Sequence, residues 1–72
     1  MTIYRLHHNG TVINYFDSLK ACAGAIKEVI DQHRDLEPQL IMNFQQKDKT
    51  VVIYRYWTNT TEMFLIEEIE KP

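Results

Sequence analysis

Apolar and polar residues alternate with a period of two along most of this chain, and one internal segment has a helical period instead. Residues 2–8 and 11–16 are rich in β-branched and aromatic residues and flank Asn9 and Gly10. An Asn-Gly pair suits the two-residue type I′ turn of a β-hairpin, because both positions need positive φ. The pattern therefore predicts an amino-terminal hairpin whose strands pair in uninterrupted register.

After Asp17 the apolar spacing changes to steps of three and four, which predicts a helix from about Ser18 to Arg34 with Asp17 as its N-cap. The charged residues of this segment lie away from its apolar positions, so the helix has one apolar stripe with which to cover a sheet. The stripe consists of Leu19, Cys22, Ile26, Val29, Ile30 and His33.

From Gln39 onward the period of two returns, broken by polar turn residues at 47–49 and 58–60. The three strands predicted here span residues 39–46, 50–58 and 61–69. The expected element order is ββαβββ, in a single α+β domain over residues 1–72. We expect an antiparallel β-sheet with one helix packed on one face.

Both faces of the last three strands are rich in apolar residues, whereas an antiparallel sheet with one wet side should alternate cleanly. We expect the helix to cover the face that carries Leu40, Met42, Val52, Tyr54 and Leu65. The opposite face is then an interface, which we predict to include Ile41, Ile53, Arg55, Trp57, Phe64 and Ile66. A curled sheet, a homodimer and a groove for a different protein are three ways to cover it.

Length and charge narrow the classes of partner. A chain of 72 residues builds one small core, and a homodimer is a common way to stabilise such a domain. Eight Lys and Arg against ten Asp and Glu give a net charge of −2, which disfavours nucleic acid as a partner. An alternative is a single-stranded nucleic-acid platform, because sheet aromatics can stack on bases. Its residues would be Tyr54, Arg55, Tyr56 and Trp57.

The residues that could carry chemistry are few. Cys22 is the single cysteine, so no disulfide forms within the chain, and its place on the helical stripe predicts a buried side chain. His7 and His8 are neighbours in a strand and point to opposite faces, which separates them as metal ligands. We expect no catalytic, cofactor-binding or metal-binding residues and no enzymatic activity. With neither a signal peptide nor a membrane span expected, the cytoplasm is the predicted location.

The opening HHNGTVINYFDSL, the chain length and the element order resemble the small Yopt-like family of bacterial prophage proteins. The resemblance covers the whole chain and implies an antiparallel α+β fold, with no activity and no site residues attached. The sequence as a whole predicts a small interaction or regulatory module that acts as a homodimer, with a host protein as a further partner. Binding of single-stranded nucleic acid is the alternative function.

Overall fold

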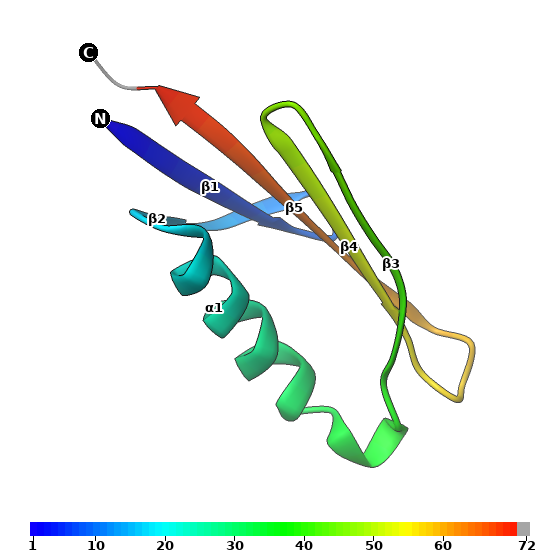
Figure 1. The fold of residues 1–72 in the computed structure, drawn as a ribbon. Helices are drawn as coiled ribbons and strands as arrows, with labels where there is room; N and C mark the ends of the chain where they lie inside the picture. Colours follow the sequence, from blue (N-terminus) through cyan, green and yellow to red (C-terminus); the bar gives the residue numbers. More distant parts are fainter. Residues whose placement is uncertain (71–72) are drawn as a thin grey trace.

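The computed structural model describes residues 1–70, which form a five-stranded antiparallel sheet with one α-helix on one side (Figure 1). The elements are β1 (Thr2–His8), β2 (Thr11–Phe16), α1 (Leu19–Asp31), the 3-10 helix η1 (Arg34–Leu36), β3 (Gln39–Gln46), β4 (Lys49–Arg55) and β5 (Thr61–Glu70). The predicted α+β class and the order ββαβββ are confirmed. The molecule is elongated and measures 43 × 21 × 19 Å.

The sheet has the strand order β2-β1-β5-β4-β3. Strand β5, the last of the chain, lies at the centre and pairs with β1 on one side and β4 on the other. The amino-terminal hairpin therefore joins the sheet through β5, a point on which the sequence pattern gives no indication. Strands β2 and β3 are the two edges of the sheet (Figure 1).

Helix α1 begins and ends at different residues from those expected. Ser18, not Asp17, is the N-cap, because its hydroxyl oxygen accepts a hydrogen bond from the Ala21 N–H at 3.1 Å. The helix ends at Asp31, and the chain then tightens into η1. Glu37 follows with a left-handed φ of 52°, which ends this helical turn.

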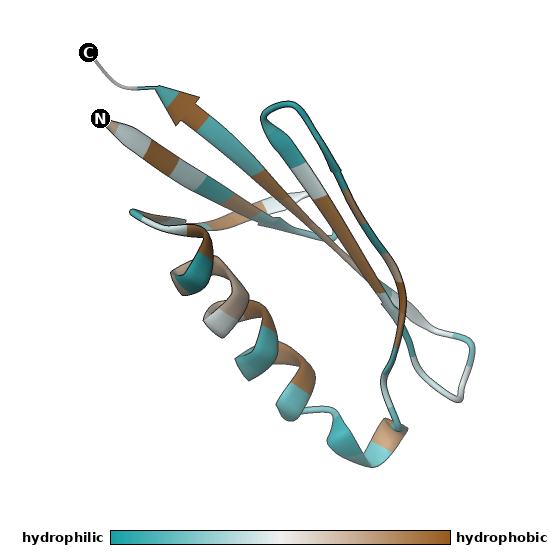
Figure 2. Cartoon of the chain, viewed as in Figure 1, coloured by the Kyte–Doolittle hydropathy of each residue, from teal (hydrophilic) through white to brown (hydrophobic). Residues whose placement is uncertain are grey.

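The core lies between α1 and one face of the sheet. Figure 2 shows apolar residues (brown) along α1 and along the strands of the sheet. The buried apolar side chains are Leu6, Cys22, Ile26, Ile30, Val52, Tyr56, Phe64 and Ile66. The predicted stripe is confirmed at Cys22, Ile26 and Ile30, whereas Leu19 at the start of the helix is 42 % exposed.

Two β-bulges interrupt the expected registers. In the amino-terminal hairpin His7 pairs with Val12 but Leu6 pairs with Asn14, so the prediction of an uninterrupted register is wrong. At the other edge of the sheet Leu40 pairs with Tyr54, whereas Met42 pairs with Ile53. The extra residue in β3 moves Met42 away from the helix, because side chains after a bulge change face.

Strand β5 directs the opposite set of side chains toward α1 from the set expected. Val52 pairs with Phe64, so Phe64 and Ile66 lie under α1 and are 0 % and 5 % exposed. Leu65, expected to lie under the helix, points to the other side of the sheet. The cause is the β4–β5 turn: β4 ends at Arg55, and the Tyr56 N–H donates to the Thr60 carbonyl at 2.8 Å. The turn is longer than the sequence pattern indicates, and a slip by an odd number of residues exchanges the faces of a strand.

Candidate interaction surface

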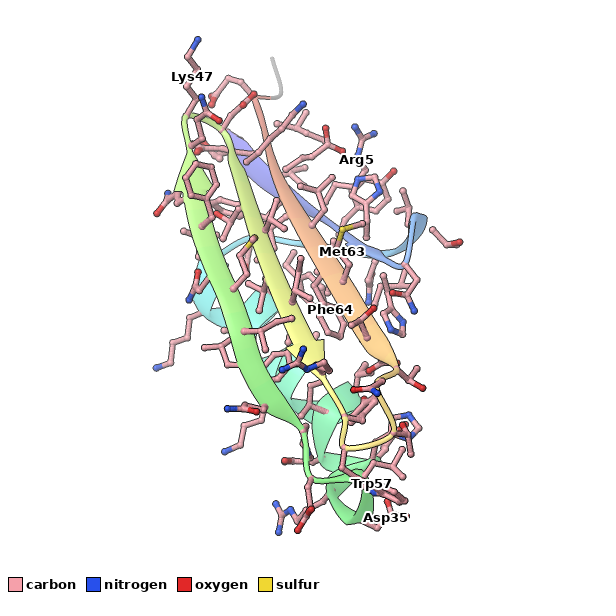
Figure 3. The ribbon with its side chains drawn as sticks, turned by 90° about the vertical axis from the view of Figure 1, so that its right-hand side faces the viewer. Arg5, Asp35, Lys47, Trp57, Met63 and Phe64 are labelled. Atoms are coloured by element: carbon pink, nitrogen blue, oxygen red, sulfur yellow. The ribbon has the colours of Figure 1, made fainter. Side chains whose placement is uncertain are left out.

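The side of the sheet that faces away from α1, here called the open face, has no covering layer within residues 1–70. Figure 3 looks onto this face, and α1 lies behind the sheet. The strand registers place six apolar side chains next to one another in two cross-strand rows. One row is Met42, Ile53 and Met63, and the other is Phe44, Val51 and Leu65. We call these six residues the apolar patch.

None of the side chains in the apolar patch is buried. Phe44 is 54 % exposed, Met42 is 47 % exposed and Met63 is 42 % exposed. Cross-strand neighbours shield one another only in part, because the sheet has no second layer on this side. A contiguous apolar surface of this kind, unlike scattered single residues, is typical of an interaction site.

Charged side chains border the apolar patch along the row that joins Arg5 with Glu67. The Arg5 guanidinium donates from Nε to Glu67 Oε1 at 3.1 Å, and its Nη2 forms an ion pair with the same oxygen at 3.0 Å. His7 Nε2 contacts the same carboxylate oxygen. Hydrogen bonds from His7 and Arg5 lower the pKa of Glu67, against the opposing effect of partial burial. Lys49, which pairs with Glu67 in the ladder, extends this charged margin.

A polar cluster on the covered side closes one end of the core. The Tyr56 hydroxyl donates to Glu62 Oε2 at 2.5 Å, and His8 Nε2 lies 3.1 Å from Glu62 Oε1. The His8 ring stacks on Phe64 with centroids 4.7 Å apart. Burial, together with the bond to Glu62, raises the pKa of Tyr56. Since these polar groups bind one another and the core, they hold the sheet and the β4–β5 turn together.

Strand β3 is an edge strand without the usual protection. All eight of its residues are exposed, and none of the residues from Gln39 to Gln46 is charged. Natural edge strands commonly carry lysine or proline, or are covered by another element, since a bare edge invites pairing with another chain. The residues from Leu40 to Gln46, here called the β3 edge, also combine high β-propensity with no net charge.

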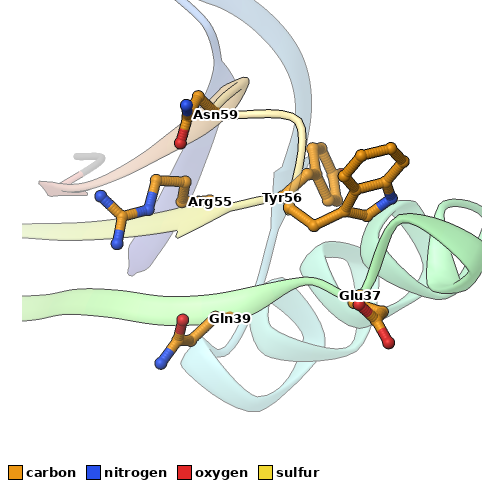
Figure 4. Close-up of a pocket in the computed structure, with 6 residues that line it drawn as sticks. Glu37, Gln39, Arg55, Tyr56 and Asn59 are labelled. Atoms are coloured by element: carbon orange, nitrogen blue, oxygen red, sulfur yellow. The ribbon is translucent and has the colours of Figure 1, made fainter.

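A shallow hollow of about 500 Å³ lies at the end of the sheet, next to the β4–β5 turn. Figure 4 shows the Arg55 side chain between those of Gln39 and Asn59. Trp57, in the turn, is 66 % exposed, and its backbone N–H donates to the Leu36 carbonyl at 3.0 Å. The hollow is open and mainly polar, which is unlike an enclosed small-molecule site.

The structure separates the residues that the sequence groups into one interface. Ile53 and Arg55 lie on the open face as expected, Ile41 lies at the bulge of β3, and Trp57 belongs to the turn. Placing Phe64 and Ile66 on the open face is wrong, because both are in the core. The sequence pattern missed Met42, Phe44, Met63 and Leu65; only the length of the β4–β5 turn and the bulge in β3 would have identified them.

The four residues proposed as a nucleic-acid platform are also separated. Tyr56 is 4 % exposed, and the Tyr54 ring packs edge-on against Phe64 with centroids 6.5 Å apart. Arg55 and Trp57 alone are exposed. Strand β4 therefore has no pair of neighbouring exposed aromatic rings on which bases could stack.

Comparison with protein-family models, with curated proteins and with solved structures finds no match to this chain. Across residues 1–70, no helix has the length and apolar character needed to cross a membrane. In the same part of the chain, no three His, Cys, Asp or Glu side chains are grouped so that they could hold a metal ion.

Proposed function

We propose that this chain is a small, non-enzymatic interaction module that acts as a homodimer in the cytoplasm, with the open face of its sheet as the working surface. One observation carries the proposal: the apolar patch lies on the open face next to the bare β3 edge. A further partner would be a host protein that binds the part of the open face left free in the dimer.

The arrangement of the open face supports this function. Interfaces between proteins have an apolar centre and a polar rim. Here the apolar patch lies between the row of Gln39, Arg55 and Thr61 and the row of Lys49, Glu67 and Arg5. Burial of apolar surface contributes about 25 cal/mol per Å². Association would therefore bury apolar surface on the open face and add to the stability that the core on the other side of the sheet provides.

The polar clusters support a role without catalysis. Glu62 and Glu67 are each held by two neighbouring side chains. Cys22 is fully buried, and desolvation raises its pKa, so its thiol is poorly suited to act as a nucleophile. Glu62, Glu67 and Cys22 therefore have structural roles in this proposal: the two carboxylates hold neighbouring strands together, and the thiol packs in the core.

The test is the dependence of the thermal midpoint on protein concentration. A homodimer unfolds at higher temperature as its concentration rises, because mass action favours the associated state. Phe44→Lys should abolish this dependence, since it places an unpaired charge in the contact. Leu19→Lys is the control, because Leu19 is similarly exposed but lies on α1. A parent midpoint that is independent of concentration would contradict the homodimer.

Single-stranded nucleic acid is the second candidate partner, because Arg55 and Trp57 are exposed close together at the end of β4. Trp57 is the single tryptophan, so its fluorescence reports directly on stacking. This function predicts that an oligothymidine quenches Trp57 saturably and that Arg55→Gln weakens the quenching. An unchanged spectrum at low salt would rule it out.

A further inference from the structure

We infer that two copies of this chain pair antiparallel through their β3 edges, so that the two sheets form one continuous sheet. The inference rests on the proposed homodimer and specifies how its two copies meet. In this arrangement a two-fold axis passes through the pair of β3 strands, perpendicular to the sheet. The open faces of both copies then lie on the same side.

The first support is the contrast between the two edges of the sheet. Strand β2 is short and has its bulge in the middle, between the partners of Leu6 and His7. Strand β3 is longer, and its bulge lies near its start, so Met42 to Gln46 pair regularly with β4. Both strands lack charged residues, but a bulge disrupts a ladder locally, whereas a long regular run can add a neighbour along its free side.

The second support is the match of side chains when β3 pairs with itself. If Asn43 faces Asn43 of the second copy, Met42 faces Phe44 of that copy, and the same contact recurs across the axis. Met42 and Phe44 are among the most exposed residues of the apolar patch. Apolar cross-strand neighbours stabilise an antiparallel pair. The most exposed part of the patch would thus cover itself in the dimer.

The backbone of β3 is compatible with this register. Gln46 pairs with Lys49 across the two-residue turn of the β3–β4 hairpin, and such flanking residues form a hydrogen-bonded pair. Hydrogen-bonded and non-hydrogen-bonded pairs then alternate along the ladder, so Asn43 and Gln45 direct their backbone groups away from β4. The N–H and C=O of Asn43 are therefore oriented toward a strand added at this edge.

The third support is the charge at the two ends of β3. Glu37 precedes the strand, whereas Lys47 and Lys49 flank Asp48 at its other end. Antiparallel pairing brings the Glu37 end of each copy to the Lys47–Lys49 turn of the other. Parallel pairing would instead place like ends together. The uncharged strand between them adds no repulsion, so the charges favour the antiparallel arrangement.

Disulfide trapping tests the register. Residues that face each other in a hydrogen-bonded antiparallel pair have Cα atoms about 5.5 Å apart, within the range that a disulfide spans. Asn43→Cys should therefore form a covalent dimer under mild oxidation. Excess parent protein should reduce the yield, because it forms mixed dimers that have only one cysteine at position 43. The control is Asn14→Cys, an asparagine at the exposed opposite edge of the sheet, which should form no covalent dimer. Cys22 is buried in both variants and serves as an internal reference.

A proline variant provides an independent readout. Asn43→Pro removes an N–H that points away from β4, which an edge strand tolerates, and it should reduce the native mass to that of one chain while the circular dichroism is kept. Dimeric Asn43→Pro, or cross-linking of Asn14→Cys that equals that of Asn43→Cys, would overturn edge pairing and leave the homodimer standing. A monomeric parent would overturn both.

Discussion

Both faces of this sheet carry a group of apolar residues, but the two groups have different surroundings. On the covered face, Leu6, Phe64 and Ile66 lie under α1 and are 0 %, 0 % and 5 % exposed. On the open face, Phe44 and Met63 are about half exposed, and the charged group of Arg5, His7 and Glu67 lies beside them. The exposures differ because α1 covers one face only, whereas the strands contribute apolar side chains to both faces.

This contrast is the ground on which we propose that a second molecule covers the open face. The covered face has a core in which even the polar groups of Tyr56 and Glu62 are paired. The apolar patch on the open face has residue types typical of a core, but its side chains are exposed or half-buried. Proteins avoid such surfaces unless another molecule covers them.

The largest expected difference between the faces is in thiol reactivity. Cys22 is 0 % exposed, and burial raises its pKa, so its reaction with a thiol reagent requires opening of the fold. We expect native Cys22 to react more slowly than a Met63→Cys thiol by a factor of about a hundred or more, as for a domain with a few kcal/mol of stability. If Cys22 reacted equally fast in native buffer and in denaturant, its thiol would be accessible in the folded protein, contrary to this prediction.

Neighbouring alanine substitutions on β5 compare the faces directly. Ile66→Ala should cost about 2–5 kcal/mol of unfolding free energy, because it leaves a cavity under α1. Leu65→Ala should cost about 1 kcal/mol, because its side chain is already partly exposed. Denaturant unfolding measures both. The reverse order of costs would mean that the faces of β5 are exchanged.

The partly buried polar cluster of the covered face, Tyr56, Glu62 and His8, should contribute less to stability than the apolar core. Tyr56→Phe removes the hydroxyl that donates to Glu62, which should cost about 1–3 kcal/mol, as for a hydrogen bond to a charged group. The raised pKa of Tyr56 also means that its phenol ionises at higher pH than an exposed tyrosine does. An alkaline absorbance titration of the parent and the variant should differ by one late-ionising tyrosine; identical curves would contradict the buried placement.

The smallest effect is expected from the charged margin of the open face. Glu67 has a pKa below its ordinary value of 4.5, so its ion pair stabilises the fold above that pH and ceases to do so as the pH falls through the lowered pKa. Arg5 and His7 contact it, and Lys49 faces it from β4. Glu67→Gln should therefore be slightly less stable than the parent near neutral pH and equally stable in acid. A difference that grows toward low pH would contradict this sign.

Much of the fold could be predicted from local pattern because the signals are local. Asn9-Gly10 specifies the first turn, and the stripe through Cys22, Ile26 and Ile30 specifies the helix and its buried side. The assignment of faces could not be predicted in the same way. It depends on the bulge at Ile41 and on the β4–β5 turn, in which Trp57 binds the Leu36 carbonyl.

These two features explain why the site was predicted only in part. Each changes the parity of a strand, and parity decides whether a residue such as Phe64 lies in the core or on the surface. The turn contacts Leu36 through the Trp57 backbone, and the bulge adds one residue to β3; a period of two reveals neither feature. Ile53 was placed on the correct face because the bulge lies in β3 and the long turn follows β4, so neither feature changes the alternation within β4.

The most direct test of the homodimer is sedimentation equilibrium of the parent and of Phe44→Lys over a range of concentrations. A homodimer that buries the β3 side of the apolar patch gives a parent mass of two chains, falling toward one chain on dilution. Phe44→Lys then has the mass of one chain throughout, with the circular dichroism of a folded protein. A parent that sediments as one chain at the highest concentration would contradict the central claim.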